Sequence, residues 1–434
     1  MAAAIHVLHG KLPYRDFWYD KPPLAALYYL LMGARPGVLL RLWDAAYLLL
    51  CCFLAFRLAR TWWGEAEGRA AALLMAFFTT FYLPAAVIPF APDALFLAPH
   101  LAAVYCARQR KAWLAGALCG LGFWINVKAL FVAVACAAWL VPSLPALLGG
   151  LAVVMGCGAA ALSAAGLLAG YWQQVWVWGL AYAAGAPVAH PLGLAVARVG
   201  HWLGFHLALA AGWVAGEWQA ERSEQLKLCV WFAVSFAAVC FGNHFAPRYF
   251  LQLLPPLVVV GSRGLVWALR QRPRMVIPVL VILLLIPFVR FAPRYWLMAR
   301  HVEWADLTLD VDSQQAAARI SALAKPGDTL FVWGYRPDVY VYTRLNSASV
   351  FWDSQPLTGV AADRHLGVSG PVVNAVTLAH LAAVERSRPT FFVDGLGPLN
   401  EKLKPQNFAS LRALLSGYHE AARTRLSIIY QRNE

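Results

Sequence analysis

The chain has 434 residues, of which 61% are hydrophobic and 13% are charged, and its formal net charge is +14. Soluble domains are about half apolar and a quarter charged. This composition, with a mean hydropathy of +0.57, therefore excludes an ordinary soluble globular protein and indicates an integral membrane protein in contact with lipids. Much of the positive charge lies in short links between apolar segments, as in cytoplasmic loops, so it indicates no nucleic-acid partner.

The chain opens with a polar segment that leads directly into apolar sequence. Residues 9–23 read HGKLPYRDFWYDKPP and combine carboxylates, cations and aromatic rings. Charge of both signs at the mouth of a membrane bundle is costly and marks a functional segment. Residues 24–32 read as a short interfacial or re-entrant helix.

Ten apolar segments follow, and we expect each to form a membrane helix. They are 35–60, 68–83, 93–107, 112–126, 129–141, 145–168, 192–216, 228–244, 249–267 and 275–291. Several are shorter than the ~20 residues that a perpendicular helix needs to cross a bilayer. This predicts that some helices are broken or that their true bounds differ by a few residues.

The cations between these segments predict the orientation. Arg and Lys concentrate in four links, at 57–69, 108–111, 222–227 and 263–274, which ten spans place on one side. Short loops rich in Lys and Arg stay in the cytoplasm. The external side then holds the loop at 1–23, the links at 84–92, 126–128, 169–191 and 242–248, and all residues after 294. We therefore expect a multi-pass protein of the cytoplasmic (inner) membrane.

Residues 295–434 are predicted to form a small extracytoplasmic α/β domain. Helices are expected at 313–323, 337–343, 379–387 and 408–415, and strands at 329–333, 348–352, 390–393 and 425–430. This alternation favours a layered α/β unit. It carries no Gly-rich nucleotide loop and no Cys/His cluster. Its role, as a lid or in recognition of an acceptor, stays open.

Four motifs occur in order along the membrane part: G-x-x-P-Y-R-D-F-x-Y-x-K-P-P-L, then Asp93 after P-F-A-P, then Lys128 after a Gly-rich segment, then H-F-A-P-R-Y-F-L-Q-L-L-P-P. This ordered set resembles the GT-C glycosyltransferases that use polyprenyl-phosphate sugars, among them bacterial relatives of protein mannosyltransferases and of the lipid A aminoarabinose transferase. The resemblance implies a GT-C-like helical bundle over residues 1–294. It also implies transfer of a sugar, hexose or pentose, from a polyprenyl-phosphate carrier to an extracytoplasmic lipid, glycan or protein.

The first loop carries two implied roles. The resemblance places Asp20 beside a divalent metal ion and Lys21 beside the donor phosphate, with Arg15 as a further phosphate contact. Transfer leaves negative charge on that phosphate, which a fixed ammonium or a metal ion would stabilise. The alternative is that Lys21 and Arg15 are interfacial side chains that reach toward water.

Two carboxylates are candidates for the base that takes the acceptor's proton, namely Asp93 and Asp16. Asp93 matches the acidic residue of the family's second external loop, and it is also a candidate helix N-cap. Lys128 is a candidate second phosphate contact, and its alternative is the interfacial role described for Lys21.

The late motif supplies three more candidates. Arg248 has the geometry of a bidentate phosphate donor. Tyr249 is a candidate to orient a sugar or phosphate oxygen, with interface anchoring as its alternative. His244 is a candidate metal ligand, and solvation of the loop is the simpler interpretation.

The resemblance also bears on the N-terminus. In the family, a first transmembrane helix is followed by a short helix with an acidic motif that holds the catalytic base. The resemblance implies that residues 2–9 are the end of that short helix. We therefore expect that this chain lacks its first helix and that its activity is impaired; a genuine variant with an external N-terminus is the alternative. Two other functions stay open, a membrane transporter or flippase and a non-catalytic truncated homologue.

Overall fold

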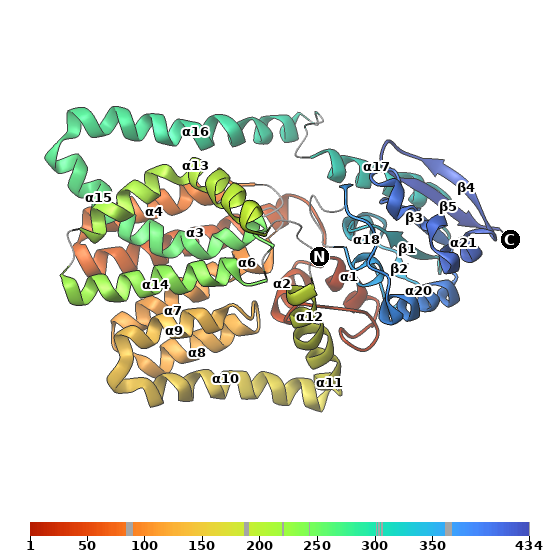
Figure 1. Cartoon of the computed structure of the whole chain (residues 1–434), viewed down its shortest axis with the longest axis horizontal. Coiled ribbons are helices and arrows are strands. Elements are labelled where there is room, and N and C mark those ends of the chain that lie inside the picture. The colour runs from red at the N-terminus through yellow and green to blue at the C-terminus, as the bar shows by residue number, and fades with distance from the viewer. Residues whose placement is uncertain are drawn as a thin grey trace.

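The computed structural model describes residues 1–83, 90–185, 191–218, 221–242, 244–300, 302, 304, 307–360 and 367–433. Long helices lie side by side in one half of the molecule, and a small α/β unit lies beyond one end of them (Figure 1). The N-terminus lies between these two parts. The predicted external links at 84–92, 169–191 and 242–248 fall partly outside the described residues.

The bundle helices are α3 (Val38–Trp63), α4 (Glu65–Thr80), α6 (Pro92–Leu95), α7 (Leu97–Arg108), α8 (Ala112–Phe123), α9 (Ala129–Leu140), α10 (Leu144–Ala164), α13 (Pro191–Glu217), α14 (Arg222–Cys240), α15 (Leu254–Gln271) and α16 (Pro273–Ala299). Each of the ten predicted segments overlaps a helix of this set. The predicted polytopic α-helical fold is therefore confirmed.

Among the described residues, six helical stretches are long and apolar enough to cross a membrane. They are Val38–Trp63, Ala129–Ala164, Leu192–Glu217, Arg222–Cys240, Pro247–Gln271 and Pro273–Ala299. The second contains both α9 and α10, which the short 3-10 turn η1 (Val141–Ser143) separates. The protein is thus a multi-pass membrane protein.

Burial differs sharply between the last two spans. The apolar window of Pro247–Gln271 is 78% buried, whereas that of α16 is 11% buried, so the rest of the chain leaves most of the apolar side chains of α16 uncovered. In the buried span, α15 approaches α13 through glycines: a Cβ added to Gly264 would lie 2.0 Å from the carbonyl oxygen of Gly212. Small residues at such crossings let membrane helices pack backbone to backbone.

The N-terminal segment forms α1 (Ala2–Leu8) and α2 (Leu24–Leu31), as predicted, with the polar loop between them. Helix α1 contacts α2 and also elements of the α/β unit, so the loop lies at the junction of the two parts. A second irregular region contains α11 (Leu168–Tyr171), the π-helix η2 (Trp172–Val177) and α12 (Trp178–Gly185).

The α/β unit contains the helices α17 (Thr308–Leu323), α18 (Asp338–Thr343), α19 (Gln355–Thr358), α20 (Ala375–Ser387) and α21 (Ala409–Leu415). Its strands are β1 (Thr329–Trp333), β2 (Asn346–Ser347), β3 (Phe391–Asp394), β4 (Tyr418–Arg423) and β5 (Ile428–Arg432). They form one sheet in the order β2-β1-β3-β5-β4. Strand β1 is parallel to β2 and β3, whereas β5 is antiparallel to β3 and β4.

Two details of this unit differ from expectation. The strand predicted at 348–352 is wrong, because the sheet strand ends at Ser347 and the next residues turn to the N-terminal loop, where Val350 accepts the backbone N–H of Trp18 at 2.8 Å. Strand β4 was not predicted, since it lies at the sheet edge and its largely exposed sequence lacks apolar alternation.

Candidate active site

A cavity of about 450 Å³ lies where the bundle, the N-terminal loop and the α/β unit meet. Its charged, histidine and tyrosine lining residues are Tyr19, Asp20, Lys21, Tyr29, Asp93, Lys128, Tyr182, His244, Arg248, Tyr249, Tyr335 and Asp353. Seven of the nine predicted site residues are in this lining; Arg15 and Asp16 are not. The fold thus brings together side chains from six separate parts of the sequence, at 19–29, 93, 128, 182, 244–249 and 335–353.

Asp93 lies between two cations. Its Oδ1 is 4.0 Å from the Lys128 Nζ, and its Oδ2 is 4.0 Å from the Arg248 Nε. The Asn126 amide donates a hydrogen bond of 3.0 Å to Oδ1. The helix-cap interpretation of Asp93 is wrong, because the N-cap of α6 is Ala91 and no side chain caps it. One carboxylate therefore gathers two cations and leaves this trio with a net positive charge.

The Lys128 ammonium is buried without a hydrogen-bond acceptor among the described residues. It lies 3.3 Å from the centroid of the Tyr249 ring, which provides a cation–π contact. Burial lowers the pKa of Lys128 to about 8, the Asp93 charge opposes this shift, and the nearby Arg248 and Lys21 charges reinforce it. A desolvated ammonium among like charges favours an anionic ligand.

The backbone that carries Arg248 is held by Tyr82, just after α4, and by Trp202 of α13. Arg248 belongs to the 3-10 helix η3 (Pro247–Leu253). The Tyr82 hydroxyl donates a hydrogen bond of 2.7 Å to the Pro247 carbonyl, and the Trp202 indole donates one of 3.0 Å to that hydroxyl. These contacts hold the backbone just before Arg248, whose guanidinium lies next to Asp93.

The first loop presents Asp20 and Lys21 to the cavity as an ion pair, with Nζ and Oδ2 2.6 Å apart. The Tyr14 hydroxyl donates to the Lys21 carbonyl at 2.7 Å, and Tyr14 itself has a φ of 67°, a left-handed conformation that needs support. That support comes from Gln174 in η2, whose amide donates to the Tyr14 carbonyl at 2.8 Å. Gln174 is not among the predicted site residues; its amide within an aromatic run is the only sequence signal.

Arg15 and Asp16 pair with each other at the surface, with Nε and Oδ1 2.9 Å apart and side chains 57% and 30% exposed. Asp16 also accepts the backbone N–H of Leu12 at 2.8 Å, which shapes the turn. Their positions therefore do not support the catalytic role predicted for Asp16 or the phosphate contact predicted for Arg15.

The predicted metal ligands Asp20 and His244 both line the cavity. Asp20 is engaged by Lys21, and the His244 ring stacks on Tyr182 with centroids 4.4 Å apart. Among the described residues, no group of three or more His, Cys, Asp and Glu side chains is placed to hold a metal ion. The metal-binding role of Asp20 and His244 therefore stays a prediction.

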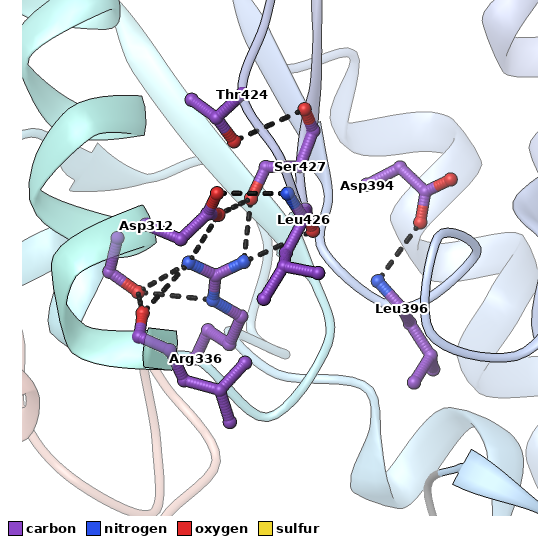
Figure 2. A network of polar contacts seen from close by, with 9 residues as sticks. Asp312, Arg336, Asp394, Leu396, Thr424, Leu426 and Ser427 are labelled. Carbon is purple, nitrogen blue, oxygen red and sulfur yellow. Dashed lines mark hydrogen bonds and ion pairs between the residues drawn. The ribbon is translucent and has the colours of Figure 1, made fainter. Parts of the chain in front are cut away.

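The α/β unit adds Tyr335, which follows β1 and is not among the predicted residues. The next residue, Arg336, is buried with Asp312 of α17, and their Nη2 and Oδ2 atoms are 2.9 Å apart (Figure 2). Arg336 also donates to the Ser427 hydroxyl at 2.6 Å and to the Ser313 hydroxyl at 2.7 Å. This network joins α17 to the turn after β1 and to the segment before β5, and it holds the turn that carries Tyr335 at the cavity.

Asp353 is the second contribution of the α/β unit, and it is 9% exposed. Its Oδ1 accepts the backbone N–H of Gln355 at 2.9 Å. Burial raises the pKa of Asp353 to about 7; the Gln355 hydrogen bond and Lys21 lower it, while the Asp20 charge raises it. The sequence around Asp353 offers no motif that would have identified it.

The fold and the cavity together define a polytopic helical membrane protein with a cation-lined site under a small C-terminal α/β unit. The chain resembles the crystal structure of ArnT from Cupriavidus metallidurans bound to undecaprenyl phosphate, with a TM-score of 0.56 and 14% identity over 95% of this chain and 88% of that chain. This likeness shows the fold.

Two further structures are of the Archaeoglobus fulgidus oligosaccharyltransferase. The first, AglB with an inhibitory peptide and a dolichol-phosphate, has a TM-score of 0.48 and 11% identity over 96% of this chain and 67% of that one. The second, a complex with Zn and sulfate, has a TM-score of 0.46 and 13% identity over 96% and 66% of the respective chains. No protein-family model matches the sequence, and no curated protein matches it.

Proposed function

We propose that this protein is a glycosyltransferase that moves a sugar from a polyprenyl-phosphate carrier to an extracytoplasmic acceptor. The observation that carries the proposal is the convergence of Lys21, Lys128 and Arg248 on one cavity at the end of an apolar bundle. A polyprenyl phosphate combines the two features that this site suits, an anionic head and an apolar tail. The fold shared with ArnT, whose structure holds undecaprenyl phosphate, supports this class of donor.

The cations have a direct role in such a transfer. As the bond between the anomeric carbon and the phosphate breaks, negative charge grows on the leaving phosphate, and fixed positive groups in a desolvated site stabilise it. The Arg248 guanidinium can donate two hydrogen bonds to one phosphate, whereas Lys21 and Lys128 act as point charges. Asp93, held by Asn126, keeps Lys128 and Arg248 close together before the donor binds.

We further propose the orientation that the basic links predict, with the cavity and the α/β unit on the external side of the inner membrane. In this arrangement residues 1–294 bind the donor lipid, and residues 295–434 cover the cavity from the side where an external lipid, glycan or protein acceptor arrives. The transporter alternative has no specific support here, because the charged residues of the cavity gather where the bundle meets the α/β unit.

The test is sugar transfer from a pool of radiolabelled polyprenyl-phosphate sugars by the purified protein in liposomes, with undecaprenyl phosphate binding measured in parallel. We expect wild type to bind the lipid and transfer label, and Lys21→Met and Arg248→Met to lose both. Lys227→Met is the matched control, since Lys227 pairs with Glu224 outside the cavity. If Lys21→Met and Arg248→Met bound undecaprenyl phosphate as tightly as wild type, this result would contradict the proposal.

A further inference from the structure

We propose that the α/β unit supplies a catalytic residue: the Asp353 carboxylate takes the proton from the acceptor hydroxyl during sugar transfer. This inference rests on the proposed function and assigns a residue that no motif indicates. It gives the small α/β unit a part in the chemistry as well as in covering the cavity.

The first support is the position of Asp353, which is held firmly at the cavity wall. The segment before it is tied to the first loop, because the Trp352 indole and the Val350 carbonyl both bond the backbone of Trp18. Trp18 precedes Asp20 by two residues, so these bonds bring Asp353 toward the Asp20–Lys21 pair. Consistent with this, the charges of Asp20 and Lys21 both act on the Asp353 carboxyl.

The second support is that one oxygen of Asp353 is available. Oδ1 accepts the Gln355 N–H, which orients the carboxyl, whereas Oδ2 has no hydrogen-bond donor among the described residues. Asp353 also forms no ion pair within the part of the chain that the structure describes. A carboxylate oxygen that has no donor, on a largely buried residue of the cavity lining, suits a hydroxyl group of a bound molecule.

The third support comes from the other carboxylates of the cavity. Asp93 lies between Lys128 and Arg248, and a proton on it would leave those two cations without their shared counter-charge. Asp20 is held 2.6 Å from the Lys21 ammonium. Both are thus engaged with the cations that hold the phosphate, while Asp353 is not, and its pKa of about 7 suits proton transfer near neutral pH.

Sugar transfer with Asp353 as the base forms one bond to the anomeric carbon and breaks another. The acceptor hydroxyl oxygen forms a bond to the anomeric carbon, and the bond from that carbon to the phosphate oxygen breaks. The electron pair of the broken bond stays on the polyprenyl phosphate, where Lys21, Lys128 and Arg248 stabilise it. The hydroxyl proton moves to Oδ2 of Asp353 and leaves to solvent after the product departs.

The pH profile reports this role. The ionisable groups that act on Asp353 are Asp20 and Lys21 from the first loop, and Tyr335 and Tyr340 from the α/β unit. A base must be deprotonated to act, so kcat of wild type should rise with pH through about 7. In the Asp353→Asn variant, this rise of kcat with pH should be absent.

The decisive experiment compares wild type with Asp353→Asn and Asp353→Glu, with Glu420→Gln as a control in the same unit, because Glu420 pairs with Arg423 at the exposed sheet edge. We expect Asp353→Asn to bind undecaprenyl phosphate like wild type and to lose roughly 10²–10⁴-fold in kcat. The Glu variant should keep part of the activity. Azide, a nucleophile with no proton to lose, should restore sugar release in the Asn variant.

The outcomes separate this inference from the proposed function. Two results for Asp353→Asn would overturn the role of Asp353: a transfer rate within about twofold of wild type, or loss of donor binding together with turnover. In either case, the Lys21→Met and Arg248→Met variants still test the donor site. If the Asn variant does not fold, the Glu variant decides: an unshifted pH profile with full kcat overturns the inference. Absence of transfer by wild type overturns both proposals.

Discussion

Gln174 and Tyr19 are joined across 155 positions of sequence by a buried hydrogen bond, in which the side-chain oxygen of Gln174 accepts the backbone N–H of Tyr19 at 2.8 Å. The same amide donates to the Tyr14 carbonyl at 2.8 Å, so one side chain bridges both ends of the segment that precedes Asp20 and Lys21. Gln174 belongs to the π-helix η2, and π-helices recur at functional sites. The hydrogen bonds of Gln174 give η2 a role in positioning the first loop.

Gln174→Leu should therefore weaken the donor site. The substitution leaves a buried N–H and a buried carbonyl unpaired, which costs ~1–3 kcal/mol for each group, and it frees the loop that presents Lys21. We expect a rise in KM for the donor and a lower melting temperature. Gln173→Leu is the matched control, because Gln173 is the exposed neighbour. If Gln173→Leu changed KM and melting temperature as much as Gln174→Leu does, the positioning role of Gln174 would be contradicted.

Lys128→Met should weaken binding of undecaprenyl phosphate without unfolding the protein. The ammonium has no hydrogen-bond acceptor among the described residues, and without it Asp93 still has Arg248 and Asn126 as partners. A charge-assisted bond from the ammonium to the ligand, in contrast, is worth ~1.5–3 kcal/mol. This corresponds to roughly a 10- to 100-fold higher Kd. Binding titrations in detergent measure it, with Lys227→Met as the reference, and an unchanged Kd would remove Lys128 from the donor site.

Donor binding should also fall as the pH rises past about 8. The pKa of Lys128 is lowered to about 8 by burial, so above that pH the free protein carries a neutral amine there and attracts the phosphate less. Lys128→Arg should remove this alkaline limb, because a guanidinium stays charged. The measurement is Kd for undecaprenyl phosphate between pH ~7 and ~9.5. If binding by Lys128→Arg still weakened above pH ~8, the titrating group would be a residue other than Lys128.

The buried pair of Arg336 and Asp312 should be essential for the fold of the α/β unit. Its side chains are 4% and 3% exposed, and removing one partner leaves a buried charge, which costs ~3–5 kcal/mol. Asp312→Asn and Arg336→Met should each lower the melting temperature and donor turnover, while the double variant Asp312→Leu with Arg336→Met recovers much of the stability. Failure of the double variant to recover would indicate that the hydrogen bonds to Ser313 and Ser427 dominate.

The α/β unit should lie outside the cytoplasmic membrane. Alkaline phosphatase fused after Asp310, within α17, should be active, because the basic links are retained on the other side. The same reporter fused after Arg110, in the link between α7 and α8, should be inactive. The reverse pattern would invert the orientation and overturn the external donor site.

The sequence by itself determined the helical membrane part and much of the α/β unit. Long apolar segments can satisfy their backbone polar groups in lipid only as helices, so each predicted segment overlaps a helix. Strand β1 is predicted with its observed bounds, because a short apolar run between a turn and polar sequence is a local signal. The ordered motifs also indicated most of the charged cavity residues, including Asp20, Lys128 and Arg248.

Only the tertiary structure decided which polar residues meet. Asp16 and Asp20 are four positions apart in one loop, yet only the second lines the cavity, because the loop is bent around Tyr14 and held by Gln174. Asp353 reaches the cavity because its segment bonds Trp18 and does not continue the sheet. Such placements depend on packing between segments more than a hundred residues apart, and no local pattern of hydrophobicity or turn residues carries that information.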